Sequence, residues 1–200
     1  LFCFFQWYGG RLVLPSFPTR RSSDLGGSSA NIAVAIARHG GKTALLTRVA
    51  DDAIGRFAVN ELNKYGIDAT HVHSEGGEAR NTLAIVETRV EDHQSVIYRN
   101  GAADFQMTIK DVESVDYASY GALITTGTVF AAEPSRSAAF HAMALAKDAG
   151  LPIIFDIDYR PYSWPSAELA AAVYSRAGNL CAIRSEERPV GIERASRGGP

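Results

Sequence analysis

The 200-residue sequence is poor in cysteine: it has only Cys3 and Cys181, and neither belongs to a CxxC pair. This scarcity excludes a small disulfide-stapled scaffold and leaves no zinc or redox motif. The net charge of −2 excludes a nucleic-acid binder that acts through bulk positive charge. No apolar run reaches the eighteen or more residues that a membrane span needs. With 46% hydrophobic residues, the composition predicts a cytoplasmic globular protein without nucleic-acid or membrane partners.

Common motifs for cofactors and metals are also missing. The sequence contains no GxxxxGK[ST] loop, no GxGxxG fingerprint and no GxSxG elbow, so no nucleotide site can be identified from motifs. His71 and His73 share a predicted strand face, but the lack of a third ligand favours a surface position. Asp51 and Asp52 stand at the start of a predicted helix and are better explained by capping than by metal binding.

The two ends of the chain lack the periodicity of helices and strands. Residues 1–25 open with an apolar run, and their arginines follow it, which is the reverse of a secretory signal peptide. Residues 184–200 are equally patternless. We interpret both segments as non-native or disordered tails, similar to translated read-through at the ends of gene fragments. The folded unit is therefore expected to span residues 26–183.

Within residues 26–183, helical and strand patterns alternate. Helices are predicted over 28–39, about 52–65, 133 to about 150 and 166–177, and strands over 42–49, 71–73, 122–126 and 152–155. Because these strands are almost continuously apolar, they predict a parallel sheet covered by helices on both faces. β-branched runs at 82–90 and 95–99 predict a hairpin inserted into this pattern, a flap or lid at about residues 81–100.

The first candidate site lies at the start of the first predicted helix, in Gly26-Gly27-Ser28-Ser29-Ala30-Asn31. Paired glycines let the backbone approach a ligand closely, and an Asn side chain can both donate to and accept from a sugar hydroxyl. The alternative is a plain helix start capped by Ser28 or Ser29. This helix is apolar nearly all round, which predicts that it is buried.

Two further candidate segments carry arginines. Asp156, Asp158 and Arg160 alternate after an apolar strand, so they point to one side of the sheet's end. The planar fork of Arg160 suits a phosphate or carboxylate, and the alternative is a structural Asp–Arg pair that closes a loop. Arg99 stands where a lid strand would turn inward, and its alternative is a solvated strand end.

In this order, the segments resemble the PfkB, or ribokinase-like, family of carbohydrate kinases. The resemblance covers about residues 26–181, and one departure is Ala50, where the family usually has the first glycine of Gly-x-Asp-x-x-Gly. It implies an α/β fold, a three-layer α/β/α sandwich with a small β lid, incomplete in this chain. The motifs that carry it are Gly26-Gly27-x-x-x-Asn31, Asp52 with Gly55, Tyr98-Arg99, Thr126-Gly127-Thr128 and Asp156-x-Asp158-Tyr159-Arg160.

The resemblance implies an enzyme that uses ATP and Mg²⁺ to phosphorylate a hydroxyl of a small sugar acid. Within the family, the chain looks most similar to the sugar-acid kinases of myo-inositol catabolism, ahead of 2-keto-3-deoxygluconate kinases and fructokinases. Phosphoryl transfer depends on positioning and charge neutralisation, which suits arginines in a substrate site. The residues to which the resemblance assigns substrate binding are Gly26, Gly27, Asn31, Arg99, Asp158 and Arg160.

Three segments that the family uses do not appear in this sequence. They are the first strand with its sugar-binding Asp, an Asn-x-x-Glu segment for magnesium, and the Gly-Ala-Gly-Asp loop with the catalytic base. We therefore assign no catalytic, nucleotide-binding or metal-binding residue, and expect this chain alone to lack kinase activity. The alternative class is a non-catalytic sugar-binding or dimerisation module. A homodimer through the lid is expected of the full-length enzyme.

Overall fold

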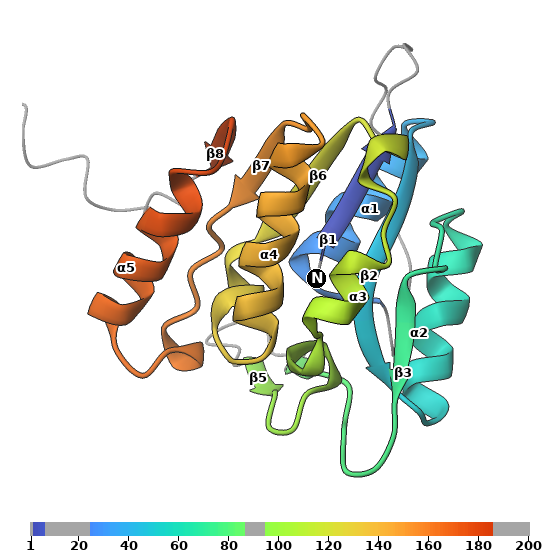
Figure 1. The fold of residues 1–200 in the computed structure, drawn as a ribbon. Helices are drawn as coiled ribbons and strands as arrows, with labels where there is room; N and C mark the ends of the chain where they lie inside the picture. The colour runs from blue at the N-terminus through green and yellow to red at the C-terminus, as the bar shows by residue number, and fades with distance from the viewer. Residues whose placement is uncertain (1, 7–24, 87–94, 186–200) are drawn as a thin grey trace, which may run out of the picture.

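The computed structural model describes residues 2–6, 25–86 and 95–185, which form a six-stranded sheet, a two-stranded sheet and the helices around them (Figure 1). The strand order in the large sheet is β3-β2-β1-β6-β7-β8. Its strands are β1 (Phe2–Gln6), β2 (Lys42–Ala50), β3 (Val72–Glu75), β6 (Ala122–Thr126), β7 (Ile153–Asp156) and β8 (Ile183–Ser185).

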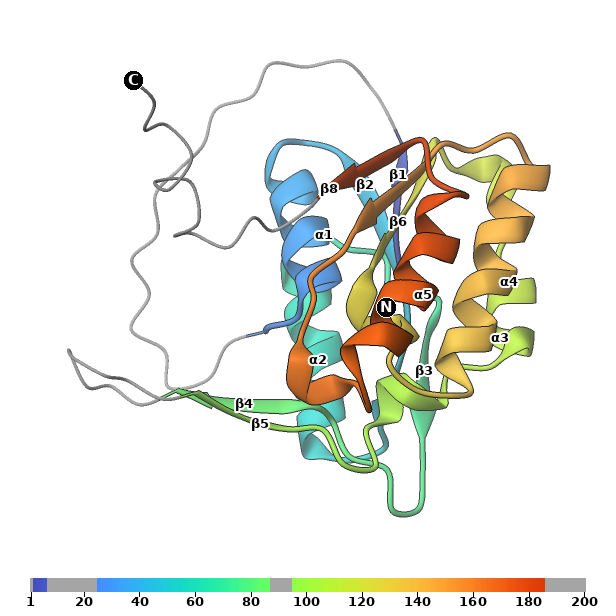
Figure 2. The ribbon, with the colours of Figure 1, turned by 90° about the vertical axis from the view of Figure 1, so that its left-hand side faces the viewer.

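Helices cover both faces of the large sheet. Figure 2 shows helices on either side of the sheet, which is the predicted three-layer α/β/α sandwich. No helix among residues 25–86 and 95–185 is long and apolar enough to cross a membrane. The helices are α1 (Ser28–Arg38) and α2 (Ala53–Lys64) on the first face, and α3 (Ile109–Glu113), α4 (Ser135–Asp148) and α5 (Ala167–Gly178) on the second.

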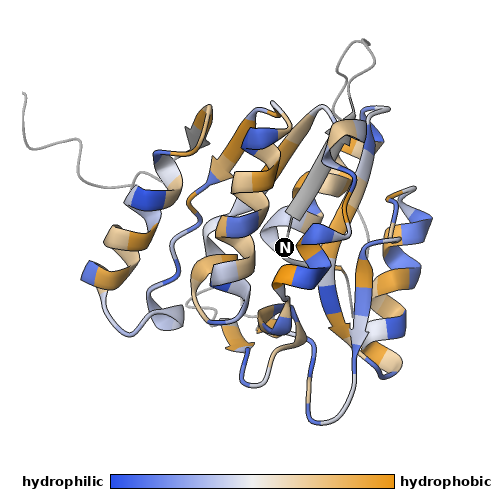
Figure 3. Cartoon of the chain, in the orientation of Figure 1, coloured by the Kyte–Doolittle hydropathy of each residue, from blue (hydrophilic) through white to orange (hydrophobic). Residues whose placement is uncertain are grey.

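The sheet supplies two hydrophobic cores because successive strand residues point to opposite faces. Leu46 and Leu123 pack into the core on the α4 and α5 side, together with the fully buried Phe155. Their neighbours Leu45 and Ile124 pack on the opposite side, with α1 and α2. In Figure 3, β7 and much of β2 are coloured as hydrophobic, whereas α2 and α5 carry both colours.

The strand β1 runs antiparallel to both of its neighbours, whereas the other adjacent pairs of the large sheet are parallel. The sheet is therefore mixed and not purely parallel as predicted. Periodicity did not predict β1, because the strand is held by backbone pairing with β2 and β6, which lie far away in the sequence. Similarly, β8 includes Arg184 and Ser185, the first residues of the second predicted tail. Residues 7–24 and 186–200 of these predicted tails lie outside the described residues.

Helix α1 differs from its prediction in two respects. Only Ser29, Ala30 and Ala33 are buried, because one face of the helix packs on the sheet while the rest is half-buried or exposed. Its N-cap is Gly27, whose φ of 102° lies in the left-handed region that favours glycine. The predicted serine cap is therefore wrong, because the Ser28 hydroxyl donates to Asp158 instead.

The start of α2 matches its prediction. The Asp52 carboxylate accepts hydrogen bonds of 2.9 Å from the backbone N–H groups of Ile54 and Gly55, which confirms capping. Gly55 has no space for a side chain, since a Cβ there would lie 1.8 Å from the Ala50 carbonyl oxygen. The helix therefore starts directly against the end of β2.

The predicted hairpin forms a separate antiparallel sheet of β4 (Leu83–Val86) and β5 (Ser95–Tyr98), with Leu83 opposite Tyr98. We call this sheet the lid. Figure 2 shows it extending from the lower edge of the sandwich, on the side of α1 and α2. The predicted residues 87–90 of the first strand lie outside the described residues.

Candidate functional site

A cavity of about 1100 Å³ lies at the carboxyl ends of β2, β6 and β7, bordered by the lid and the start of α1. Ligands of parallel α/β sheets bind at this edge, where helix N-termini also point. The volume is sufficient for a small metabolite. The structure brings all six predicted site residues to this one cavity: Gly26, Gly27, Asn31, Arg99, Asp158 and Arg160.

Asp158 joins two of the predicted segments. Its carboxylate accepts a hydrogen bond from the Ser28 hydroxyl and forms an ion pair with Arg160, with 2.5 Å between Oδ1 and Nη2. Asp158 is only 4% exposed, whereas the Arg160 side chain remains 41% exposed at the cavity. The structural Asp–Arg pair is therefore present, and it forms part of the cavity wall.

The backbone of Asp158 is held in an unusual conformation. Its φ of 36° is in the left-handed region, which costs energy for a residue other than glycine. The preceding residue, Ile157, lies close against Gly127, where a Cβ would be 1.8 Å from the Ile157 carbonyl oxygen. Gly127 thus allows the loop after β7 to approach β6 closely enough to bring Asp158 beside Ser28.

A buried aromatic pair lies behind this loop. The Tyr174 hydroxyl accepts a 3.1 Å hydrogen bond from the Trp164 indole N–H, and a Cβ on Gly127 would lie 2.8 Å from that hydroxyl oxygen. Burial raises the pKa of Tyr174 to about 12, so the phenol stays neutral at physiological pH. The Trp164–Tyr174 pair therefore packs behind the segment that carries Asp158 and Arg160 and supports its position.

Arg99 lies at the base of the lid and is only 16% exposed, so the alternative of a solvated strand end is wrong. Its Nη2 forms an ion pair with Asp104, and its guanidinium lies 3.9 Å from the centre of the Phe105 ring. The same carboxylate of Asp104 accepts a 2.9 Å hydrogen bond from the hydroxyl of Thr82, the residue that precedes β4. Asp104 therefore ties together the two ends of the lid.

Sequence reasoning missed three residues that build this cavity: Ser28 as a partner of Asp158, Asp104 and Asn81. Asp104 stands in a short 3₁₀ segment, Ala103–Gln106, and has no motif around it. Asn81 lies in the connection before β4, and its Oδ1 accepts a 3.1 Å hydrogen bond from the Ala50 N–H. No motif signals these residues, and most of their contacts join distant segments: Ser28 with Asp158, Asn81 with Ala50 and Asp104 with Thr82.

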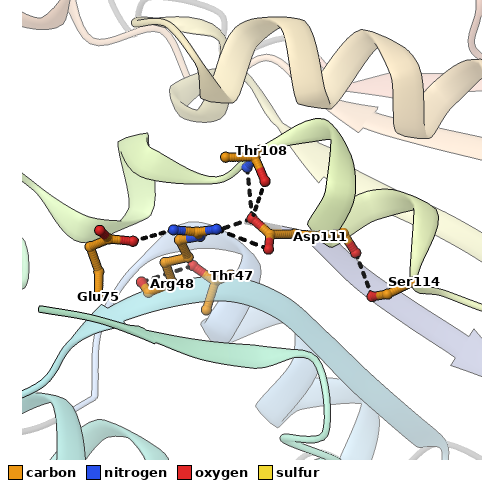
Figure 4. Close-up of polar contacts among 6 residues, drawn as sticks. All are labelled: Thr47, Arg48, Glu75, Thr108, Asp111 and Ser114. Carbon is orange, nitrogen blue, oxygen red and sulfur yellow. Dashed lines mark hydrogen bonds and ion pairs between the residues drawn. The ribbon is translucent and has the colours of Figure 1, made fainter.

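Arg48 also borders the cavity, but carboxylates surround its guanidinium (Figure 4). Its Nε and Nη2 donate to the two oxygens of Asp111 at 2.8 and 3.0 Å, and its Nη1 pairs with Glu75. Burial disfavours the charge of Asp111, but the hydrogen bonds from Arg48 and Thr108 outweigh it and lower the pKa of that carboxyl. This network connects β2, β3 and α3, so we assign Arg48 a structural role.

The structure gives no support to a metal site among residues 2–6, 25–86 and 95–185. No group of three or more His, Cys, Asp or Glu side chains in these ranges is arranged to hold an ion. His71 lies outside the cavity, 3.4 Å from the Tyr120 hydroxyl, and burial lowers its pKa despite the opposing charge of Asp68. Mg²⁺ in kinases is commonly held by one or two carboxylates together with substrate phosphates, and no described residue is identified as such a ligand.

Comparison with known proteins gives a consistent result. The family model of the "pfkB family carbohydrate kinase" matches residues 17–186. A 5-dehydro-2-deoxygluconokinase of Geobacillus kaustophilus is 39% identical over 160 residues, which are 80% of this chain and 48% of that protein. One of Clostridium perfringens is 40% identical over 156 residues, 77% of this chain and 46% of that protein. The chain therefore spans about half the length of these curated relatives.

Solved structures show the same fold. The apo fructokinase of Vibrio cholerae O395 is 29% identical with a TM-score of 0.73, over 80% of this chain and 54% of that one. The form of that fructokinase with fructose, ADP and calcium bound is 29% identical with a TM-score of 0.68, over 80% of this chain and 51% of that one.

Proposed function

Because the chain belongs to the pfkB family of carbohydrate kinases, we propose that the whole protein phosphorylates a sugar acid, most specifically 5-dehydro-2-deoxy-D-gluconate, with ATP. The observation that carries this proposal is that Arg99 and Arg160 line one cavity together with Asn31. Arginine pairs well with a carboxylate, which a sugar acid has and a neutral sugar lacks. The relatives from Geobacillus and Clostridium are named 5-dehydro-2-deoxygluconokinase, which agrees with this substrate.

Each predicted residue then has a distinct role in holding the sugar acid. Gly26 and Gly27 let the backbone approach the ligand, and Asn31 exchanges hydrogen bonds with its hydroxyl groups. Arg99 approaches from the lid, and Arg160 steadies either the carboxylate or the transferred phosphoryl group. Asp158 positions Arg160 through their 2.5 Å ion pair. Such positioning and charge neutralisation are the main protein contributions to phosphoryl transfer.

We propose that this chain alone binds the sugar acid but does not turn it over. The sequence contains neither the Gly-Ala-Gly-Asp loop nor the Asn-x-x-Glu segment of the family. A coupled assay of ATP consumption with 5-dehydro-2-deoxy-D-gluconate should therefore show no activity above a blank. Turnover by the purified chain would contradict this part of the proposal.

Substrate choice is tested by isothermal titration of the 200-residue chain with 5-dehydro-2-deoxy-D-gluconate, 2-keto-3-deoxygluconate and fructose. We expect binding of the two sugar acids, with the first tighter, and little binding of neutral fructose. Fructose binding as tight as that of the acids would refute the role of Arg99 and Arg160 and favour a fructokinase. Tighter binding of 2-keto-3-deoxygluconate would leave a sugar-acid kinase with a different substrate.

We also propose that the full-length enzyme forms a homodimer through the lid. Four apolar side chains share one lid face through cross-strand pairing and are 43–59% exposed: Leu83, Ile85, Val96 and Tyr98. Exposed apolar patches of this kind mark interfaces. Sedimentation velocity of the full-length enzyme should show a dimer, and the double variant Val96→Ser with Tyr98→Ser should be a monomer. The control is Ile109→Ser in α3, where Ile109 is 44% exposed, and this variant should remain a dimer. An unchanged dimer in the double variant would refute the lid interface.

A further inference from the structure

The amide of Asn81 has a fixed orientation at the junction of the lid and the sandwich. Its Oδ1 accepts a 3.1 Å hydrogen bond from the backbone N–H of Ala50, the last residue of β2. An N–H donor can only face the oxygen of the amide, so this bond determines which end of the side chain is which. The other end, Nδ2, is therefore directed away from Ala50.

The Nδ2 group of Asn81 is buried and has no hydrogen-bond partner among the described residues. Leaving a buried N–H donor unpaired costs free energy, and such groups in native structures call for an explanation. The same is true of Nε of Arg99, whose Nη2 is paired with Asp104. Both residues flank the lid, and both line the cavity that also contains Arg160.

We propose that Asn81 is a specificity-determining residue, whose Nδ2 donates a hydrogen bond to a hydroxyl or carbonyl oxygen of the bound sugar acid. This inference rests on the proposed function. The cations Arg99 and Arg160 are matched to the charged carboxylate, which leaves the neutral amide for an uncharged oxygen. Because Nδ2 is buried in this structure, its contact with a ligand requires the lid base to shift. A site with such a donor discriminates against analogues that lack the matching oxygen.

The test compares Asn81→Asp with a matched control, Asn100→Asp. The Asn81→Asp variant keeps an oxygen for the Ala50 N–H and removes the donor, while adding one negative charge near the cavity. Asn100 is exposed, lies at the lid base after β5 and does not line the cavity, so its variant adds the same charge close by without removing the Asn81 donor. Thermal unfolding of both variants checks that the fold is retained.

We expect Asn81→Asp to weaken binding of 5-dehydro-2-deoxy-D-gluconate at least about fivefold, and Asn100→Asp to change it less than about twofold. The loss should persist in 1 M salt, where charge repulsion is screened within about 3 Å. In ¹⁵N spectra of the wild-type chain, the side-chain NH₂ signal that disappears in Asn81→Asp should shift on titration with the same sugar acid.

The outcomes separate this inference from the function on which it rests. If the wild-type chain binds the sugar acid but the two variants bind it equally, or the Asn81 NH₂ signal does not move, the role of Asn81 is refuted and the proposed function stands. A loss in Asn81→Asp that vanishes in 1 M salt also refutes it, since charge alone then explains the effect. If the wild-type chain binds no sugar acid, the proposed function and the role of Asn81 are both refuted.

Discussion

Gly127 is the position at which a single methyl group should disturb both the fold and the cavity. A Cβ there would lie 1.8 Å from the Ile157 carbonyl oxygen and 2.8 Å from the Tyr174 hydroxyl oxygen. To regain van der Waals distance, the Ile157 carbonyl has to move by roughly 1.6 Å. Because the obstacle is backbone and not the end of a flexible side chain, the loop after β7 must shift as a whole.

The magnitude for Gly127→Ala follows from this overlap. Inserting a methyl group into packed structure costs about 1–3 kcal/mol. For a chain of this size, each kcal/mol lowers Tm by about 2–4 °C, so we expect a decrease of roughly 2–12 °C. The displaced residues directly precede Asp158 and Arg160, so binding of the sugar acid should also weaken, by at least about tenfold if a hydrogen-bonded ion pair is lost from the site.

Differential scanning calorimetry and titration with 5-dehydro-2-deoxy-D-gluconate measure the two effects separately. The matched control is Gly76→Ala, since a Cβ on Gly76 has no heavy atom within 4 Å and its backbone is outside the left-handed region. Its stability should change by less than about 0.5 kcal/mol. Equal Tm values for the two alanine variants would refute the close approach of Ile157 to Gly127. A Gly127→Ala variant that binds the sugar acid more weakly but has the same Tm as Gly76→Ala would also contradict the reasoning, because the loop after β7 cannot move without loss of packing.

Three more predictions concern ion pairs. Asp111→Asn breaks the bidentate contact with Arg48; the side chains of Arg48 and Asp111 are only 19% and 10% exposed, so the free energy of unfolding in urea should fall by roughly 3 kcal/mol. The control is Asp116→Asn, at an exposed position. Equal urea midpoints for the two variants would contradict the network of Figure 4. Because folding depresses the pKa of Asp111 below its ordinary 3.8, the stability from this pair is complete above that pH and is lost as pH falls through the lowered value. The wild type should therefore lose more stability than Asp111→Asn below pH 4, and parallel pH profiles of Tm would refute this. Arg160→Lys keeps the positive charge but loses the planar guanidinium, and it should weaken sugar-acid binding about tenfold with little change in Tm. The control is Arg56→Lys at an exposed position of α2, which should bind the sugar acid as the wild type does. Unchanged binding by Arg160→Lys would show that Arg160 does not contact the ligand.

Local patterns predicted the elements whose stability comes from their own residues. A short buried strand is predicted over 122–126, and the structure has β6 at Ala122–Thr126. The capping of α2 by Asp52 is equally local, since donors and acceptor lie within three residues. The prediction of a serine cap for α1 failed because the competing acceptor, Asp158, lies 130 residues away.

The candidate site was predictable to the extent that its residues lie at strand ends or helix starts. In a parallel sheet the carboxyl ends of the strands and the N-termini of helices meet at one edge, so the helix start at Asn31 and the strand-end segment at Arg160 converge as a consequence of topology. The partners that complete the cavity follow from packing instead. Asp104 reaches Thr82 only because the lid returns to the sandwich at that point, and Asn81 reaches Ala50 because the chain enters the lid beside the end of β2. Periodicity and motif spacing carry no information on such contacts.

Pairing of the charges also changes how the cavity can select an anion. Arg99, Arg160 and Arg48 would attract a sugar acid from a distance if they were alone. Each is instead paired with a carboxylate of the chain, Asp104 for the first and Asp158 for the second, while Arg48 has two such partners. These three arginines thus face four carboxylates, so together they contribute no net positive charge to steer the ligand. Selection must therefore come from direct contacts. The ligand carboxylate competes with Asp104 for Arg99, and the other ligand oxygens accept hydrogen bonds from donors whose directions are fixed by the fold. Such a cavity should distinguish sugar acids by the placement of their oxygens more strongly than by their charge.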